Sequence, residues 1–169
     1  MAQSKAPFRV PIRKLADAKG AVVDKFALLV RMNPQYWPAW ERNIGPGQES
    51  RVWFETGRRI PEEIHAGLQV VVLGTSGMGI LAIGETASAA EFRADPDRAE
   101  ADPSEQAEFK EPRNRVCIRL KGLAAPVPVE DAEANPDTAR LPKAARETIT
   151  WLKSHEHAVL MSVVQRHNG

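Results

Sequence analysis

Two apolar runs separated by a glycine-bearing loop constrain the fold of this chain more than any other feature. Residues 68–73 and 78–87 have the length and composition of strands, and only residues 74–77, two of them glycine, separate them. Such a pattern is typical of a β-hairpin. Strict alternation predicts two faces for the second strand, one with Ile80, Ala82, Gly84 and Thr86 and the other with Leu81, Ile83 and Glu85.

Further strands and helices are predicted on both sides of this hairpin. Strands are expected at residues 26–30, 52–54 and 116–120, and helices at residues 33–40 and 142–152. Residues 13–24 fit a helical turn or an irregular lead-in, residues 124–136 are extended, and residues 157–164 fit either a strand or a helix. We therefore expect an α+β fold with antiparallel or mixed strands in a strongly bent sheet or small barrel.

The chain length of 169 residues fits one domain. We expect an N-terminal tail at residues 1–20 and a single domain at 21–169, interrupted by a mobile insert at 91–114. Residues 1–60 hold eleven basic and five acidic side chains, whereas residues 91–111 hold three basic and eight acidic ones. This distribution predicts either one local positive face or a mixed, solvated surface.

The single cysteine, Cys117, excludes a disulfide within the chain and is expected to be a buried thiol in the middle of a strand. The N-terminus has no apolar segment of the kind that directs secretion, and no apolar run reaches the roughly 20 residues that span a membrane. The sequence therefore predicts a cytoplasmic protein with no membrane partner.

Residue types that carry metal or covalent chemistry are sparse. The four histidines lack the spacing of a zinc helix, and one cysteine cannot form a multi-cysteine site, so we expect no metal and no cofactor. Residues 75–79 are rich in glycine but lack the lysine of a phosphate-binding P-loop. They are either a plain hairpin turn or a loop that closes over a ligand.

Trp53 stands out among the four tryptophans. A tryptophan usually belongs to the core, and that expectation holds for Trp40 and for Trp151 on its predicted helix. Trp53 instead lies between Arg51 and a polar run that contains Arg58 and Arg59. Aromatic side chains flanked by arginine are used for stacking on nucleic-acid bases, at roughly 1–3 kcal/mol per base.

Three motifs together resemble the EVE domain family. They are the strand at residues 26–30 followed by Asn33-Pro34 and Trp37, the Val52-Trp53 pair that opens the next strand, and the hairpin at 68–86. The order is also similar to that of YTH domains, which are relatives of EVE within the PUA-like superfamily. The resemblance covers residues 26–90.

The resemblance implies a PUA-like bent β-barrel of mixed or antiparallel strands with flanking helices. It implies a non-catalytic module that binds DNA or RNA, reads a modified base in an aromatic pocket and can act with a partner such as a nuclease. The implied site consists of Trp53 as the stacking wall, Asn33 and Trp37 as further walls, Thr75, Ser76 and Gly77 as the bordering loop, and Arg58 and Arg59 facing phosphate. YTH domains carry a second tryptophan beyond the hairpin loop, and Met78, Ile80 or Leu81 would have to replace it here.

Two other classes of function stay open at this point. An enzyme could use the same pocket, with Glu55 or His65 as the nearest groups able to transfer a proton. A small-ligand or protein-interaction module would have a pocket without surrounding positive charge.

Overall fold

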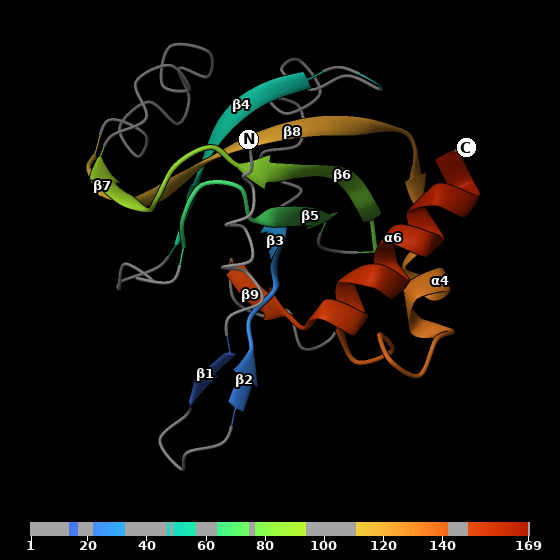
Figure 1. Cartoon of the computed structure of the whole chain (residues 1–169). Coiled ribbons are helices and arrows are strands. Elements are labelled where there is room, and N and C mark those ends of the chain that lie inside the picture. The colour runs from blue at the N-terminus through green and yellow to red at the C-terminus, as the bar shows by residue number, and fades with distance from the viewer. Residues whose placement is uncertain are drawn as a thin grey trace, which may run out of the picture.

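The computed structural model of the chain describes residues 14–16, 22–32, 47, 49–56, 64–74, 77–93, 111–141 and 149–168. Within these residues the fold is α+β, with a two-stranded sheet, a seven-stranded sheet and the helices α4 (Val129–Glu133) and α6 (Ser154–Asn168) (Figure 1). The strands of the described part are β1 (Lys14–Ala16), β2 (Val22–Asp24), β3 (Ala27–Met32), β4 (Glu49–Glu55), β5 (Gln69–Gly74), β6 (Gly79–Thr86), β7 (Glu91–Arg93), β8 (Arg113–Val127) and β9 (Ile149–Leu152).

The large sheet is mixed. Its order is β4-β8-β6-β5-β3-β9, and β7 pairs with β8 beside this path. Strands β3 and β5 are parallel, and every other described pair in this sheet is antiparallel. The strands expected around residues 26–30, 52–54, 68–73, 78–87 and 116–120 are confirmed, and so is the antiparallel β5–β6 pair. The described strands form an open order, with β4 and β9 at its two ends.

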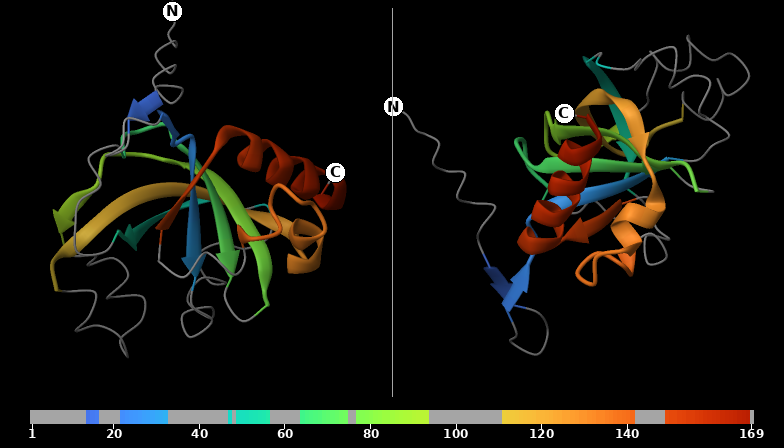
Figure 2. Two further views of the ribbon diagram at one scale, coloured as in Figure 1. Left: turned by 90° about the horizontal axis from the view of Figure 1, so that it is seen from below. Right: turned by 90° about the vertical axis from the view of Figure 1, so that its right-hand side faces the viewer.

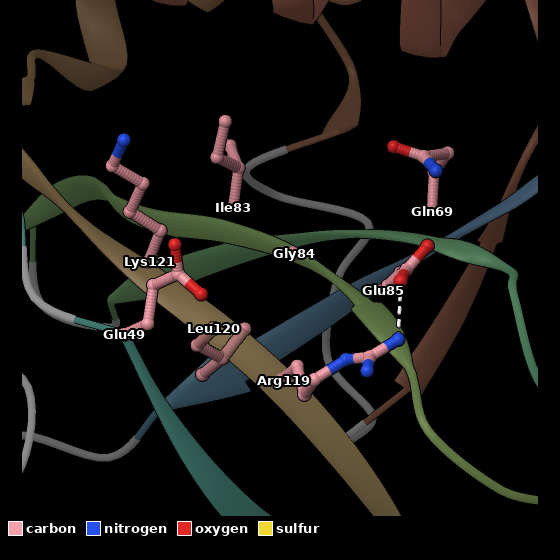
Figure 3. Close-up of a pocket in the computed structure, with 8 residues that line it drawn as sticks. All are labelled: Glu49, Gln69, Ile83, Gly84, Glu85, Arg119, Leu120 and Lys121. Carbon is pink, nitrogen blue, oxygen red and sulfur yellow. Dashed lines mark hydrogen bonds and ion pairs between the residues drawn. The ribbon is translucent and has the colours of Figure 1, made fainter.

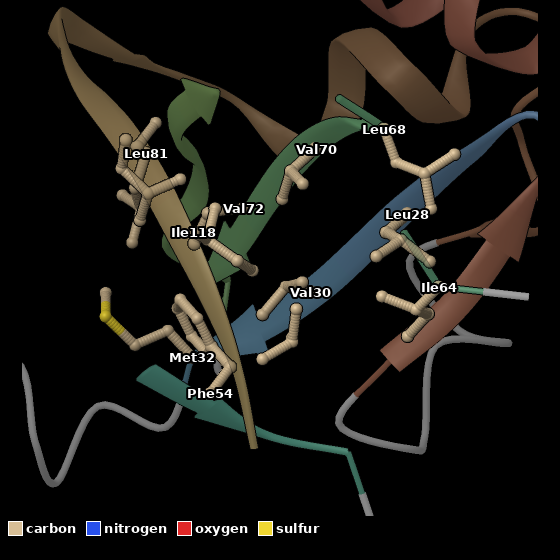
Figure 4. Close-up of a cluster of buried hydrophobic side chains, with 13 residues drawn as sticks. Leu28, Val30, Met32, Phe54, Ile64, Leu68, Val70, Val72, Leu81 and Ile118 are labelled. Carbon is tan, nitrogen blue, oxygen red and sulfur yellow. The ribbon is translucent and has the colours of Figure 1, made fainter. Parts of the chain in front are cut away.

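Each face of the large sheet carries its own apolar cluster. The inner face holds a cluster built mainly from β3, β5 and β8, in which Leu28, Val70 and Ile118 are almost fully buried (Figure 4). The outer face holds a second cluster, in which Leu29 and Val71 pack with Leu160 of α6. Helix α6 therefore covers only one part of the outer face, while the sheet bends strongly beneath it (Figure 2).

A β-bulge changes the expected faces of β6. In the pairing of β6 with β5, Ile80 lies opposite Leu73 and Ala82 lies opposite Val72, which leaves Leu81 as an extra residue. As a result Ile80 belongs to the outer cluster, while Leu81 and Ala82 both belong to the inner one. The prediction that Ile80 and Ala82 share a face was wrong, because an inserted residue breaks the two-residue period.

Strand β8 is longer than expected because it has neighbours along its whole length. Residues 113–115 pair with β7, residues 115–121 with β4, and residues 118–127 with β6. Pro126 can lie within it because the ladder with β4 already ends at Lys121, so its missing N–H is not needed on that side. The extended segment expected at 124–136 is thus part strand and part helix α4.

Residues 149–152 form a strand, so the helix expected at 142–152 was wrong over these residues. Strand β9 pairs antiparallel with β3, with Trp151 opposite Leu28. Ile149 and Thr150 are β-branched, which favours a strand once a free sheet edge is available. Trp151 packs against the inner cluster, so its expected core position is confirmed on a strand.

The segment that fitted either a strand or a helix lies within α6. Leu160, Val163 and Val164 recur at helical spacing and are buried against the sheet. At the start of the helix, the buried carboxylate of Glu156 accepts a hydrogen bond from the Lys153 amide at 2.8 Å. This contact satisfies one of the amides that the first turn leaves without a helical partner.

The ends of the expected tail and insert are strands. Strand β1 lies inside the expected tail and pairs with β2 in a hairpin that projects from the large sheet (Figures 1 and 2), so neither a helical turn nor an irregular lead-in forms at the described residues between 13 and 24. Strand β7 and the start of β8 lie inside the expected insert. Residues 94–110 and the helix expected at 33–40 lie outside the described residues.

Thr86 links β6 to the segment that leads into β5. Its buried Oγ1 accepts a hydrogen bond from the Leu68 amide at 2.9 Å and donates one to the His65 carbonyl at 2.6 Å. Because Thr86→Val leaves both groups without a partner, we expect the free energy of unfolding in urea to fall by about 1–3 kcal/mol. Thr150→Val on β9 is the matched control. An equal loss in both variants would contradict this role of the hydroxyl.

Burial lowers the pKa of His157 on α6 from its ordinary value of 6.5. Its ring packs against Phe26, and its Nε2 is buried with no hydrogen-bond partner among the described residues. Below pH 6.5 the unfolded chain therefore takes up this proton more readily than the folded chain, so stability falls as the pH falls. We expect His157→Leu to reduce this loss of stability, measured by urea unfolding at several pH values. His155→Leu, at an exposed position of the same helix, should not reduce it. Equal pH profiles of stability in wild type and His157→Leu would refute this role of His157.

Candidate functional site

Trp53 lies on the outer face of the sheet, in the part that α6 leaves uncovered. Its neighbours Val52 and Phe54 pack against the inner cluster, so strand alternation turns Trp53 to the opposite side. Its cross-strand partner on β8 is Cys117, which is buried as expected. The Trp53 side chain itself is half-buried.

Arg93, the last residue of β7, stacks on Trp53. Its guanidinium carbon lies 4.0 Å from the centre of the ring, the geometry of a cation–π contact. The Arg93 backbone is anchored by Arg115, a buried side chain of β8 that donates to the Arg93 carbonyl and, at 3.0 Å, to the Glu111 carbonyl. Arg115 thus holds together the two described ends that border residues 94–110 and fixes the position of Arg93 beside Trp53.

A row of basic side chains extends from Trp53 along the same face. Arg51 is two residues before Trp53 on β4, and its direct cross-strand partner on β8 is Arg119. Lys121 follows two residues further along β8 and therefore lies on the same side. Like charges placed directly opposite each other destabilise a sheet. We call Arg51, Trp53, Arg93, Arg119 and Lys121 the Trp53 surface.

Acidic groups neutralise this surface only in part. Glu85 of β6 forms an ion pair with Arg119 at 2.5 Å, and Glu55 forms one with Arg113 at 3.1 Å. Glu49 is the direct cross-strand partner of Lys121. In the part of the chain that the structure describes, the side chains of Arg51 and Lys121 make no hydrogen bond or ion pair. The surface therefore retains positive charge that an anion could neutralise.

The structure does not bring Trp53 and Gly77 together, although both were expected to border one pocket. Trp53 is level with Cys117 on β8, whereas Ile80, next to the β5–β6 turn, is level with Val127. Along β6, six residues separate Ile80 from Thr86, which is opposite Ile118, so the two levels lie roughly 20 Å apart along the sheet. The other expected site residues, Asn33, Trp37, Arg58, Arg59, Thr75 and Ser76, lie outside the described residues.

The side chains considered as a replacement for a second tryptophan do not face Trp53. Met78 and Leu81 pack in or against the inner cluster, and Ile80 belongs to the outer cluster beneath α6. The partner that the structure gives Trp53 is Arg93, forty residues away in the chain.

Arg93, Arg119 and Lys121 were not identified as site residues from the sequence alone. One signal was available: in the segment 113–121, basic residues occupy four of the five alternate positions, namely Arg113, Arg115, Arg119 and Lys121, with Cys117 at the fifth. In a strand this period directs all four to one side. The contact of Arg93 with Trp53 had no comparable local signal.

The two side chains considered for catalysis, Glu55 and His65, each contact another group of the protein. Glu55 is held by Arg113, and the Nδ1 of His65 lies 2.9 Å from the Ala66 carbonyl oxygen. Among the described residues, no three His, Cys, Asp or Glu side chains gather as a possible metal site. The helices within the described ranges are also too short or too polar to cross a membrane.

Solved structures of other proteins share this fold. No family model and no curated protein matches this chain. A hypothetical protein from Leishmania major matches with a TM-score of 0.58 and 13% identity over 85% of this chain and 96% of its own. Proteins from Pseudomonas putida (TM-score 0.54, 14% identity, 82% and 99% covered) and Rhodopseudomonas palustris (0.52, 19%, 83% and 93%) also match. At these identities the similarity shows a shared fold.

The Trp53–Arg93 contact can be measured by a double-mutant cycle. We expect a coupling of about 0.5–1 kcal/mol in the free energy of unfolding between Arg93→Ala and Trp53→Leu, because the cation–π contact needs both groups. The same cycle with Arg119→Ala in place of Arg93→Ala should give a coupling near zero. Coupling that is absent from the first cycle would show that the two side chains do not stack in solution.

Proposed function

We propose that this chain is a non-catalytic nucleic-acid-binding module whose contact surface is the Trp53 surface. The observation that carries the proposal is the position of a half-buried tryptophan on the part of the sheet face that α6 does not cover, beside the directly opposed cations Arg51 and Arg119 and near Lys121. Proteins that bind single strands combine a basic track for the phosphates with aromatic side chains on which bases stack. The Trp53 surface supplies both.

In the proposed complex a base stacks at the Trp53–Arg93 pair. Both aromatic rings and guanidinium planes stack on bases. The incoming base therefore either extends the stack on Arg93 or takes its place on the ring, which frees the guanidinium for a phosphate. Arg51 and Lys121 neutralise the phosphates on the other side, which relieves the repulsion between Arg51 and Arg119.

The resemblance to EVE domains suggests which kind of base this surface recognises. We propose that the chain has a PUA-like bent barrel and prefers a modified base in DNA or RNA, with a nuclease or other effector as partner. Extraction of a base costs a few kcal/mol, which stacking and hydrogen bonds to the base edge must offset. A methyl group adds about 1 kcal/mol through apolar burial, so phosphate contacts must provide most of the affinity.

Fluorescence anisotropy with labelled single-stranded DNA and RNA tests the binding surface. We expect Trp53→Leu to weaken binding roughly tenfold or more through lost stacking. Arg51→Ala should weaken binding to all sequences and reduce the slope of log K against log salt by about 0.7. Arg166→Ala, which removes an exposed arginine of α6, is the control of equal charge.

Two outcomes would contradict the proposal. One is no binding to any oligonucleotide at low salt, and the other is an equal loss of affinity in Arg51→Ala and Arg166→Ala.

The modified-base component is tested separately with oligonucleotides that differ only in a methylated cytosine or adenine. Equal affinities within each pair would reject the modified-base component while leaving the binding surface in place.

A further inference from the structure

A hollow of about 270 Å³ opens on the outer face of the sheet beside the Trp53 surface. Its lining residues come from four neighbouring strands and are Glu49, Gln69, Ile83, Gly84, Glu85, Arg119, Leu120 and Lys121 (Figure 3). Arg119 and Lys121 belong both to this hollow and to the Trp53 surface. The hollow therefore continues the proposed binding surface toward β5.

The backbone of β6 and β8 forms the floor of the hollow. Leu120 turns its side chain to the inner cluster, and Gly84 has none. The two strands are so close here that a Cβ on Gly84 would lie 1.9 Å from the Arg119 carbonyl oxygen. The close approach of the two strands thus depends on glycine at position 84, and the hollow is bordered by side chains that stand on one side of the sheet (Figure 3).

Three polar groups form one row across the hollow. Arg119 is the cross-strand partner of Glu85, and Glu85 is the cross-strand partner of Gln69. Arg119 occupies only the Oε1 oxygen of Glu85, and the exposed amide of Gln69 has no hydrogen bond among the described residues. The end of the row toward β5 therefore presents a carboxylate acceptor next to an amide that both donates and accepts.

These groups match the edge of a base that carries an amino group. Glutamine pairs with the N6 and N7 atoms of adenine, and glutamate accepts from exocyclic amines, whereas thymine and uracil present two carbonyls there. Lys121 and Arg119 line the same hollow and supply its positive charge. The Arg119 end of the row lies two residues of β8 from the level of Trp53, roughly 7 Å. Gln69 lies on β5, three strands from β4, so roughly 14 Å across the sheet separates it from the Trp53 strand, a span that a few nucleotides of one bound strand cover.

We infer that this hollow is a second nucleotide subsite, in which Gln69 and Glu85 read the edge of an amino-bearing base, with adenine preferred, on the same bound strand as the nucleotide stacked at Trp53. This inference rests on the proposed nucleic-acid binding and adds a sequence preference to it. Gln69 sets the preference, whereas Lys121 and Glu49 set the affinity for any sequence through their charges.

The test compares affinities for oligo-dA with oligo-dT, and for oligo-A with oligo-U. We expect wild type to bind the adenine oligonucleotide about tenfold or more tightly than its thymine or uracil counterpart. In Gln69→Ala and Gln69→Leu this affinity ratio should fall by a factor of at least about five. Gln165→Ala, an exposed glutamine on α6, should leave the ratio unchanged. Lys121→Ala should weaken binding to both members of each pair equally, and Glu49→Gln should strengthen it equally.

The outcomes separate this inference from the proposed function. An adenine ratio that is unchanged in both Gln69 variants, or a wild type without any preference, would overturn the subsite while Trp53→Leu and Arg51→Ala still weaken binding. Absence of binding to every oligonucleotide would overturn both. A ratio that shifts in Glu49→Gln as much as in Gln69→Ala would also reject the assignment of the base edge to Gln69.

Discussion

The side-chain alternation of β8 is the constraint on which the rest of the structure depends. Toward the inner face the strand contributes Val116, Ile118 and Leu120 to the main cluster, and toward the outer face it presents Arg119 and Lys121. Because β8 pairs with β4, β6 and β7, a shift of one residue in its register would exchange the core for the charged face along three ladders at once. The core and the candidate site are therefore specified by one register.

One part of the outer face of the sheet packs against α6, and another part carries the Trp53 surface. Helix α6 covers the part where Leu29, Val71 and Leu73 lie, and it does not extend over the polar part near β4. Arg51 and Arg119 are opposed there at an energetic cost that the fold itself does not require. Positive charge beside a tryptophan stacked by Arg93 is what makes nucleic acid the proposed ligand. The hollow that ends at Gln69 is the means that we propose for distinguishing bases on the same face.

The predictions that failed did so where distant segments meet. Residues 149–152 carry a helix-compatible pattern, but the free edge of β3 recruits them as β9. The apolar run of β6 fits a regular strand, yet a bulge against β5 turns Ile80 and Ala82 to opposite faces. The basic alternation in residues 113–121 was present in the sequence, whereas the anchoring of β7 by Arg115 depends on hydrogen bonds to Arg93 and Glu111.

The sequence by itself determined the strands β3, β5, β6 and the centre of β8, the hairpin between β5 and β6, and the α+β class. These features follow from short apolar runs and a glycine loop, whose preferences act between residues close in the chain. Only the tertiary structure decided that Trp53 meets Arg93 and lies far from Gly77. Strand order and register join residues distant in the chain, and no local pattern encodes which of several compatible edges will pair.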